Sequence, residues 1–233
     1  MKLFVRSFLF NVAFFGWTSC LAILVLPSLM MSRTVLLRAV KVWVRGVLLL
    51  QWLPGQRVQL RGQDKIPPWP VLVASKHQSA WDTLIFNIAL DDPCFVLKKE
   101  LYRIPIFGWE LRHASMIAID RRGGAAALKG MLRDAKQAIS AGRPILIFPE
   151  GTRTRPGTCV PYQPGITALY QALDIPVLPV ALNSGKCWPR RGFLRYPGTM
   201  VVEFQSLIPP GLGRAEFEAS LRNAIEQSSV SLS

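Results

Sequence analysis

The sequence predicts an α/β domain, with a mostly parallel sheet flanked by helices, preceded by an N-terminal membrane-associated helical segment. Three observations predict this fold class. The N-terminal part is strongly apolar, the rest of the chain contains short runs that are apolar throughout, and plausible helices lie between several of those runs. Apolar strands that alternate with helices are typical of a parallel sheet covered on both faces. We expect residues 1–55 to form the membrane-associated helices and residues 56–233 to form the α/β domain.

The first element is an uncharged run from Ser7 to Ser32. About 20 predominantly apolar residues suffice to cross a bilayer. The run is longer than the apolar part of a secretory signal, and no A-x-A cleavage site closes it. It therefore predicts a retained membrane segment, in which Asn11, Gly16 and Pro27 would allow a bend or a re-entrant turn.

A second helix is predicted from Thr34 to Leu53. Its basic residues Arg38, Lys41 and Arg45 are three and four positions apart, which groups them on one helical face. This pattern is typical of a helix in the membrane interface, but a helix docked on the protein's own core has the same amphipathicity. The positive charge after the apolar run outweighs that before it, so we expect the α/β domain on the cytoplasmic side of the cytoplasmic membrane.

The formal net charge is +14, and eight basic residues precede Asp64, the first acidic one. Such a balance suits an anionic partner, either nucleic acid or a membrane surface. The charge is concentrated beside an apolar stretch and no nucleic-acid-binding motif is present, so no nucleic-acid partner is expected. The four cysteines lie far apart and match no C-x-x-C pattern, which indicates reduced thiols rather than a zinc site or a disulfide framework.

Six apolar runs predict strands: VLVAS (71–75), CFVLK (94–98), SMIAID (115–120), PILIFPE (144–150), PVLPVAL (176–182) and TMVVEF (199–204). Helices are predicted near residues 80–89, 125–141, 165–173 and 214–227, and the terminal SSVSLS is expected to be frayed. In sheets of this kind the ligand site lies outside the carboxyl ends of the strands. Polar residues directly after a predicted strand are therefore the candidates for a functional site.

The first such cluster is SKHQSAWDT, in which Asp82 follows His77 by five residues. A neutral histidine accepts a proton near neutral pH, and a carboxylate on its other ring nitrogen fixes its tautomer. Ser79 and Asp82 also form an S-x-x-D pair, close to a capping box at a helix start. The spacing alone therefore leaves two interpretations open, a catalytic base with its partner or a helix cap.

The second cluster is FPEGTRTRPG, at 148–157, which presents a carboxylate at Glu150 and a guanidinium at Arg153. Arginine offers paired donors that match phosphate oxygens. The alternative is a solvated turn in which these two residues pair with each other. Lys98 ends the predicted strand at 94–98 and Arg121 follows the one at 115–120. These cations either converge on an anion at the same sheet edge or remain solvated.

These residues fall into four motifs: HQSAWD at 77–82, IDR at 119–121, FPEGTR at 148–153 and IPVLPV at 175–180. In this order and at about this spacing they resemble the motifs of the glycerolipid acyltransferases, over roughly residues 71–183. Lys76 departs from the asparagine that commonly precedes the histidine, and Ala118 from an aromatic residue that often precedes IDR. Neither departure touches the expected base or its partner.

The resemblance implies transfer of an acyl group from a thioester, either acyl-CoA or acyl carrier protein, to the sn-2 hydroxyl of 1-acyl-sn-glycerol-3-phosphate. No further cofactor and no metal are implied. His77 would act as general base with Asp82 orienting it, and no acyl-enzyme is needed, so Ser79 would be a helix cap rather than a nucleophile. Backbone amides at the helix start after His77 would stabilise the oxyanion.

The resemblance also implies a set of substrate-binding residues: Lys98, Arg121, Glu150, Gly151, Thr152 and Arg153. In this set, Arg153 and Lys98 would bind the phosphate of the acceptor, with Arg121 as a third cation. Glu150 would shape the site by holding Arg153.

Three alternatives remain. The acceptor of an acyltransferase could be another lysolipid, such as lyso-ornithine lipid, and a non-catalytic lipid-binding protein would use the same charge and apolar N-terminus. The third is a metal hydrolase that uses His77, Asp82 and Glu150. It is disfavoured because the chain has two histidines and no H-E-x-x-H cluster. The second histidine, His113, lies in ELRHASM with no acidic residue adjacent to it, and a structural or surface role is expected for it.

Overall fold

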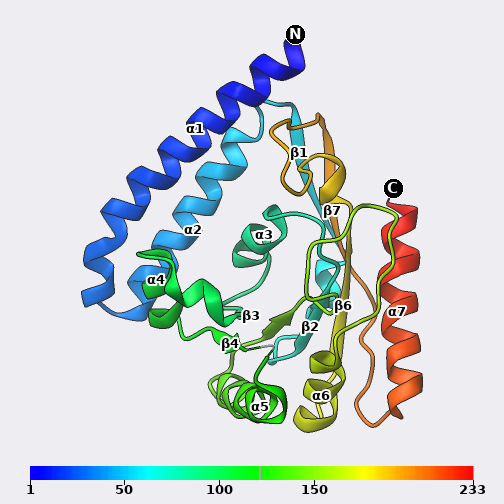
Figure 1. Cartoon of the computed structure of the whole chain (residues 1–233). Helices are drawn as coiled ribbons and strands as arrows, with labels where there is room; N and C mark the ends of the chain where they lie inside the picture. Colours follow the sequence, from blue (N-terminus) through cyan, green and yellow to red (C-terminus); the bar gives the residue numbers. More distant parts are fainter. Residues whose placement is uncertain (121, 233) are drawn as a thin grey trace.

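The computed structural model describes residues 1–120 and 122–232, and its seven-stranded sheet lies between two layers of helices (Figure 1). The strands are β1 (Gln56–Arg61), β2 (Leu72–Ser75), β3 (Cys94–Lys98), β4 (Ile117–Ile119), β5 (Ile145–Ile147), β6 (Val177–Leu182) and β7 (Gly198–Phe204). The α-helices are α1 (Lys2–Val25), α2 (Arg33–Leu50), α3 (Trp81–Ala89), α4 (Phe107–His113), α5 (Gly124–Ser140), α6 (Pro164–Leu173) and α7 (Arg214–Ser231). Short 3-10 turns are η1 (Leu26–Met30), η2 (Gln63–Lys65), η3 (Lys99–Arg103) and η4 (Ser184–Lys186).

The strand order is β1-β7-β6-β2-β5-β3-β4. All neighbouring pairs are parallel except β6 with β7, which are antiparallel. This topology confirms the predicted fold class. The carboxyl ends of β2, β3, β4, β5 and β6 consequently meet at one edge of the sheet, where a site is expected.

Both faces of the sheet are buried, as the side chains of β2 illustrate. Leu72 and Ala74 belong to an apolar core shared with α5, α6 and α7, whereas Val73 belongs to a core shared with α2 and α3. Successive side chains of a strand point to opposite faces, so an unbroken apolar run fills both cores. Polar groups are left for the strand ends.

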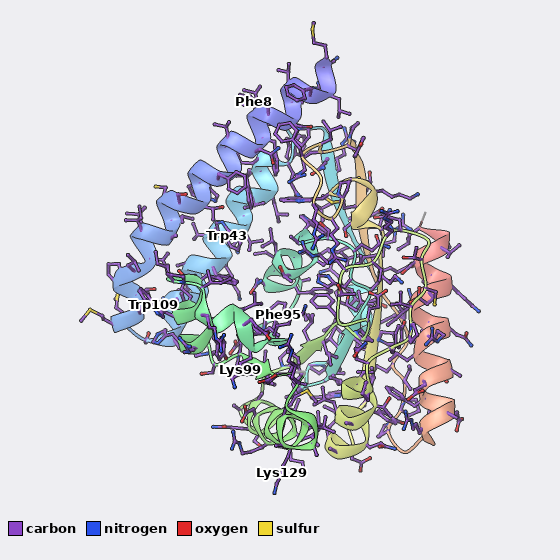
Figure 2. All side chains as sticks on the ribbon, in the orientation of Figure 1. Phe8, Trp43, Phe95, Lys99, Trp109 and Lys129 are labelled. Carbon is purple, nitrogen blue, oxygen red and sulfur yellow. The ribbon has the colours of Figure 1, made fainter. Side chains whose placement is uncertain are left out.

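The N-terminal helices form a hairpin (Figure 1). α1 continues through Asn11 and Gly16, and the chain turns at η1, which contains Pro27. Among the described residues, Lys2–Met30 is the one stretch long and apolar enough to cross a membrane, with a mean hydropathy of 2.0 and only 11% of the window buried. Its apolar side chains therefore favour membrane association. Figure 2 shows them along α1, including Phe8, which is half exposed.

α2 docks on the protein's own core. This was the alternative to a helix that lies in the membrane interface. Leu36, Val44 and Val47 are fully buried, and α2 packs against both α1 and α3. The basic residues Arg38 and Arg45 are exposed. The helix therefore has one face in the core and a positively charged face toward solvent.

Three local predictions were wrong or incomplete. β1 was not predicted, because Val58 and Leu60 alternate with charged and amide side chains instead of forming an apolar run. α4 was also missed. The tail expected to fray continues α7 to Ser231, because Ser229 is buried against the domain.

Gly46 of α2 gives the hairpin its close contact. An added Cβ would overlap the indole ring of Trp17, whose Nε1 donates to the carbonyl of Trp43 at 3.0 Å. We expect Gly46→Ala to lower the free energy of unfolding by about 1–3 kcal/mol, the usual cost of overpacking. Thermal unfolding in detergent micelles measures it. The matched control is Gly16→Ala on α1, where nothing lies within 4 Å of the added Cβ; equal stability of the two variants would contradict the prediction.

Candidate active site

His77 and Asp82 are in contact. His77 follows β2, and its Nδ1 lies 2.9 Å from Oδ2 of Asp82 in the first turn of α3. The imidazole also stacks on Phe148, with ring centroids 3.9 Å apart. A carboxylate at Nδ1 favours the tautomer that is protonated there, which leaves the lone pair of Nε2 free to accept a proton. The geometry is therefore that of a general base with an orienting carboxylate.

Asp82 is fully buried and also organises the helix start. Its Oδ2 accepts the amides of Gln78 at 2.7 Å and Ser79 at 2.8 Å, and its Oδ1 accepts the hydroxyl of Ser184. The Ser79 hydroxyl in turn accepts the amide of Trp81 at 3.1 Å. Asp82 thus both organises the helix start and orients the imidazole, because the bonds at the helix start also fix its carboxylate beside His77.

These same bonds bear on one expectation. The amides of Gln78, Ser79 and Trp81 already donate to Asp82 or Ser79, so these three are engaged. Stabilisation of an oxyanion by other amides at this helix start stays a prediction. The buried hydroxyl of Ser79 acts as a cap acceptor, as expected of a residue that is not the nucleophile.

Glu150 binds the backbone of the histidine loop. Its Oε2 accepts the amide of His77 at 2.8 Å, and its Oε1 accepts the hydroxyl of Thr154 at 2.9 Å. The amide of Thr154 donates in turn to the carbonyl of His77 at 2.8 Å. The loops after β2 and β5 are thereby locked together around His77.

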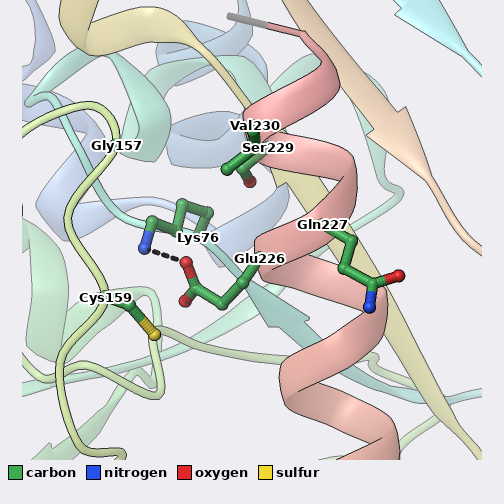
Figure 3. A pocket seen from close by; sticks show the side chains of 7 residues that line it. All are labelled: Lys76, Gly157, Cys159, Glu226, Gln227, Ser229 and Val230. Carbon is green, nitrogen blue, oxygen red and sulfur yellow. Dashed lines mark hydrogen bonds and ion pairs between the residues drawn. The ribbon is translucent and has the colours of Figure 1, made fainter.

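The expected pairing of Glu150 with Arg153 is wrong: in the described part of the chain, the ion-pair partner of Glu150 is Lys76. The Lys76 ammonium lies 2.6 Å from Glu150 and 2.6 Å from Glu226 of α7, and donates to the carbonyl of Thr158 at 2.9 Å. Tyr162 donates its hydroxyl to Glu226. Figure 3 shows Lys76 reaching Glu226 beside a cavity of about 370 Å³.

Lys76 remains charged despite its burial. Its side chain is 1% exposed. Burial alone lowers the pKa of its ammonium, but Glu150 and Glu226 outweigh that effect and raise this pKa above its ordinary value. Because successive side chains at the strand end alternate, Lys76 faces α7 while His77 faces Phe148 and α3. The two neighbours thus connect the site to opposite layers of the fold.

The remaining residues of the second cluster have separate roles. Gly151 adopts a φ of 66°, and its amide closes a turn onto the carbonyl of Phe148, which favours glycine there. Thr152 is exposed. Arg153 is half-buried, and burial lowers the pKa of its guanidinium, while Asp82 partly raises it. The amide of the next residue, Thr154, donates to the carbonyl of His77, so Arg153 lies beside the histidine loop.

Lys98 lies at the same edge of the sheet as His77. Phe95 of β3 is level with Leu146 of β5, which is level with Val73 of β2, and Lys98 is three residues beyond Phe95. One strand separates β3 from β2, so their backbones are about 10 Å apart. The Lys98 side chain is exposed. Arg121 lies outside the described residues, so its predicted role stays a prediction.

Sequence reasoning missed Ser184, Glu226 and the partnership of Lys76. Ser184 comes two residues after the predicted strand at 176–182, so its position after a strand was an available signal. Glu226 lies on a polar helix, and nothing local distinguishes it from other charged residues there. Lys76 departs from the residue that is common before the histidine of the motif. Nothing in the neighbouring sequence indicates that its ammonium is buried.

No group of three or more His, Cys, Asp or Glu side chains that could hold a metal ion occurs within residues 1–120 and 122–232. His113 is the last residue of α4.

Comparison with known proteins adds independent findings. A family model described as acyltransferase matches residues 57–183. A 1-acyl-sn-glycerol-3-phosphate acyltransferase from Pseudomonas aeruginosa is 40% identical over 161 residues, covering 69% of this chain and 63% of that protein. The 1-acyl-sn-glycerol-3-phosphate acyltransferase alpha of Homo sapiens is 31% identical over 182 residues, covering 76% of this chain and 64% of that protein. The chain thus spans slightly less than two thirds of the length of these curated relatives.

A solved structure has the same fold. The crystal structure of the 1-acyl-sn-glycerophosphate acyltransferase from Thermotoga maritima matches with a TM-score of 0.80 at 20% identity. The match covers 98% of this chain and 96% of that one, so it includes the N-terminal hairpin as well as the sheet.

Proposed function

The chain belongs to the acyltransferase family, and from that premise we propose that it transfers a fatty acyl group from a thioester to the sn-2 hydroxyl of 1-acyl-sn-glycerol-3-phosphate. The product would be phosphatidic acid, a precursor in phospholipid biosynthesis. The observation that carries the proposal is the His77–Asp82 pair, with Nδ1 held at 2.9 Å and Nε2 left to accept a proton. The names of the relatives support this choice of acceptor.

In the proposed acyl transfer, His77 carries the one proton that has to move. Nε2 of His77 takes the proton of the acceptor hydroxyl as its oxygen attacks the thioester carbonyl. The tetrahedral intermediate then expels the thiolate of the carrier, which takes the proton from the imidazolium. Asp82 stabilises the imidazolium between these steps, and the enzyme ends as it began. The donor would be acyl-CoA or acyl carrier protein, without a further cofactor.

We also propose that α1 lies in the cytoplasmic membrane, with the α/β domain on its cytoplasmic side. The acceptor is an amphiphile that resides in a bilayer, so the site has to open near the lipid surface. The apolar side chains of α1 and the exposed Arg38 and Arg45 of α2 support this placement. Trp109, half exposed on α4, lies near the turn between the two helices, because α4 contacts η1 (Figure 2).

Purified full-length protein assayed with a panel of lysolipids, each with acyl-CoA and with acyl carrier protein, tests the function. We expect the highest kcat/KM with lysophosphatidic acid. Preference for another lysolipid, such as lyso-ornithine lipid, would replace the acceptor, and lipid binding without transfer would favour a binding protein. Activity that is lost in excess chelator and restored by Zn²⁺ or Mn²⁺ would favour a metal hydrolase.

Arg153→Lys tests the phosphate contact. Lysine keeps the charge but loses the planar pair of donors that matches phosphate oxygens. We expect the KM for lysophosphatidic acid to rise about 10-fold, the loss of one charge-assisted hydrogen bond, with a smaller effect on the KM for the acyl donor. Steady-state kinetics with each substrate varied in turn measures it. Equal increases in both constants would point to a general structural role for Arg153.

A further inference from the structure

Two arginines outside the four motifs lie against the motif arginine. They belong to the segment Cys187–Pro197, between η4 and β7. Nη1 of Arg190 donates to the main-chain carbonyl of Arg153 at 2.8 Å. Arg191 follows with a φ of 61°, a left-handed conformation that is uncommon for a residue with a side chain. Both are exposed, so their guanidinium groups are open to a ligand.

The hydrogen bond from Arg190 brings two neighbouring positive charges, those of Arg190 and Arg191, to the loop of Arg153. Besides the effect of burial, both Arg190 and Arg191 lower the pKa of Arg153, against the opposite effect of Asp82. None of the three side chains forms an ion pair with a carboxylate in residues 1–120 and 122–232. Like charges held near one another repel. An arrangement of this kind is stabilised when an anion with several negative oxygens binds among them.

The segment that carries Arg190 and Arg191 is fixed by the N-terminal helix. The hydroxyl of Ser7 accepts the amide of Arg195 at 2.9 Å, and Nδ2 of Asn11 donates to the carbonyl of Phe193 at 2.9 Å. Aromatic rings also meet across this contact, Phe4 with Phe193 in a tilted pair and Phe10 with Trp188 edge to face. The arginines are therefore held between α1 on one side and the loop of Arg153 on the other.

We propose that Arg190 and Arg191 bind the phosphate of the acceptor together with Arg153, and that they select a phosphomonoester over a neutral or zwitterionic headgroup. The inference rests on the proposed function and deepens it by naming residues that determine acceptor specificity. A phosphomonoester has a second pKa near 6, so it carries close to two negative charges at neutral pH. Three guanidinium groups match that charge better than they match a diester or an ornithine headgroup.

The position of Arg153 beside the histidine loop favours binding of the acceptor's phosphate over binding of the phosphates of the acyl donor. In lysophosphatidic acid, two carbon atoms and one oxygen separate the reacting hydroxyl oxygen from phosphorus. Its phosphate therefore has to lie beside the base. Arg153 meets this condition, because the amide of the next residue, Thr154, donates to the carbonyl of His77. In acyl-CoA the long pantetheine arm separates the thioester from the nearest phosphate, so those phosphates lie farther from His77.

The test uses full-length protein in mixed micelles with Arg190→Ala, Arg191→Ala and the double variant. We expect the KM for lysophosphatidic acid to rise about 10-fold in each single variant and more in the double one, as for the loss of hydrogen bonds to a charged group. The KM for the acyl donor should stay unchanged. Arg190→Lys should recover part of the effect. The matched control is Arg214→Ala, an exposed arginine of α7 paired with Glu218.

Binding of lysophosphatidic acid without acyl donor separates this inference from the proposed function. Suppose that the wild-type protein transfers no acyl group but binds lysophosphatidic acid, and that the double variant binds it at least 10-fold more weakly. This result would support the phosphate site and contradict the proposed acyl transfer. Unchanged acceptor KM and binding in an active double variant would overturn the inference. A rise confined to the KM for acyl-CoA would assign the arginines to the donor and overturn it equally.

Discussion

Replacing His77 by alanine should lower kcat for acyl transfer by about 100- to 10,000-fold, the usual contribution of a general base. The protein should still fold, because Asp82 keeps three other donors, the amides of Gln78 and Ser79 and the hydroxyl of Ser184. Association with membranes should also be unchanged, since α1 is far from the substitution in the sequence and keeps its exposed apolar face.

Single-turnover kinetics at saturating substrate measure the chemical step, and circular dichroism during heating reports the fold. The matched control is His113→Ala, which removes the second histidine of the chain and should leave kcat within about twofold, as for a residue outside the site. A well-folded His77→Ala variant with the wild-type rate would refute the assignment of the base.

Replacing Lys76 by methionine should be among the most destabilising single changes in the protein. The substitution keeps similar length but leaves the buried carboxylate of Glu150 and the partly buried one of Glu226 without their shared ammonium. Removing one partner of a buried ion pair costs about 3–5 kcal/mol, because the remaining charge is uncompensated. Burial raises the pKa of the Glu150 carboxyl and Lys76 lowers it, so removing Lys76 raises this pKa further. The loss should therefore be smaller at acidic pH, where Glu150 can bind a proton.

Chemical denaturation of the full chain in detergent measures this loss. Lys129→Met on α5 (Figure 2) is the matched control, and as an exposed lysine it should change stability by less than about 0.5 kcal/mol. Glu226→Gln in the Lys76→Met background should recover part of the stability, since it removes one of the two carboxylates. Additive losses in the double variant would show that Lys76 and Glu226 do not interact.

The fold class could be predicted because its main signal is local. Cys94–Lys98 is a strand with the predicted bounds, and α5 and α6 each differ from prediction by one residue at either end or less. In each case a run of apolar side chains, or a helical period, marks the element. β1 escaped prediction because it is an edge strand, in which Val58 and Leu60 alternate with polar side chains on the solvent side.

In the candidate site, too, the contacts between residues close in sequence were predictable and the long-range ones were not. The contact of His77 with Asp82 lies within five residues, so local geometry and a motif were enough to suggest it. The partner of Glu150 was predicted wrongly, because Arg153 is near in sequence while Lys76 is brought near only by the pairing of β2 with β5. Arg190 and Arg191 lie in a loop whose course depends on packing against α1, for which the sequence contains no local signal.

The bond between Lys76 and Glu226 joins residues 150 positions apart. During translation at roughly 5–20 residues per second, about 8–30 s pass between the addition of these two residues. All four motifs are synthesised within that interval, and the apolar N-terminal segment is already available to a membrane, but the Lys76 ammonium lacks its second carboxylate until the interval ends. The site is therefore assembled at the end of synthesis, and a nascent chain halted before α7 should be inactive although it contains all four motifs.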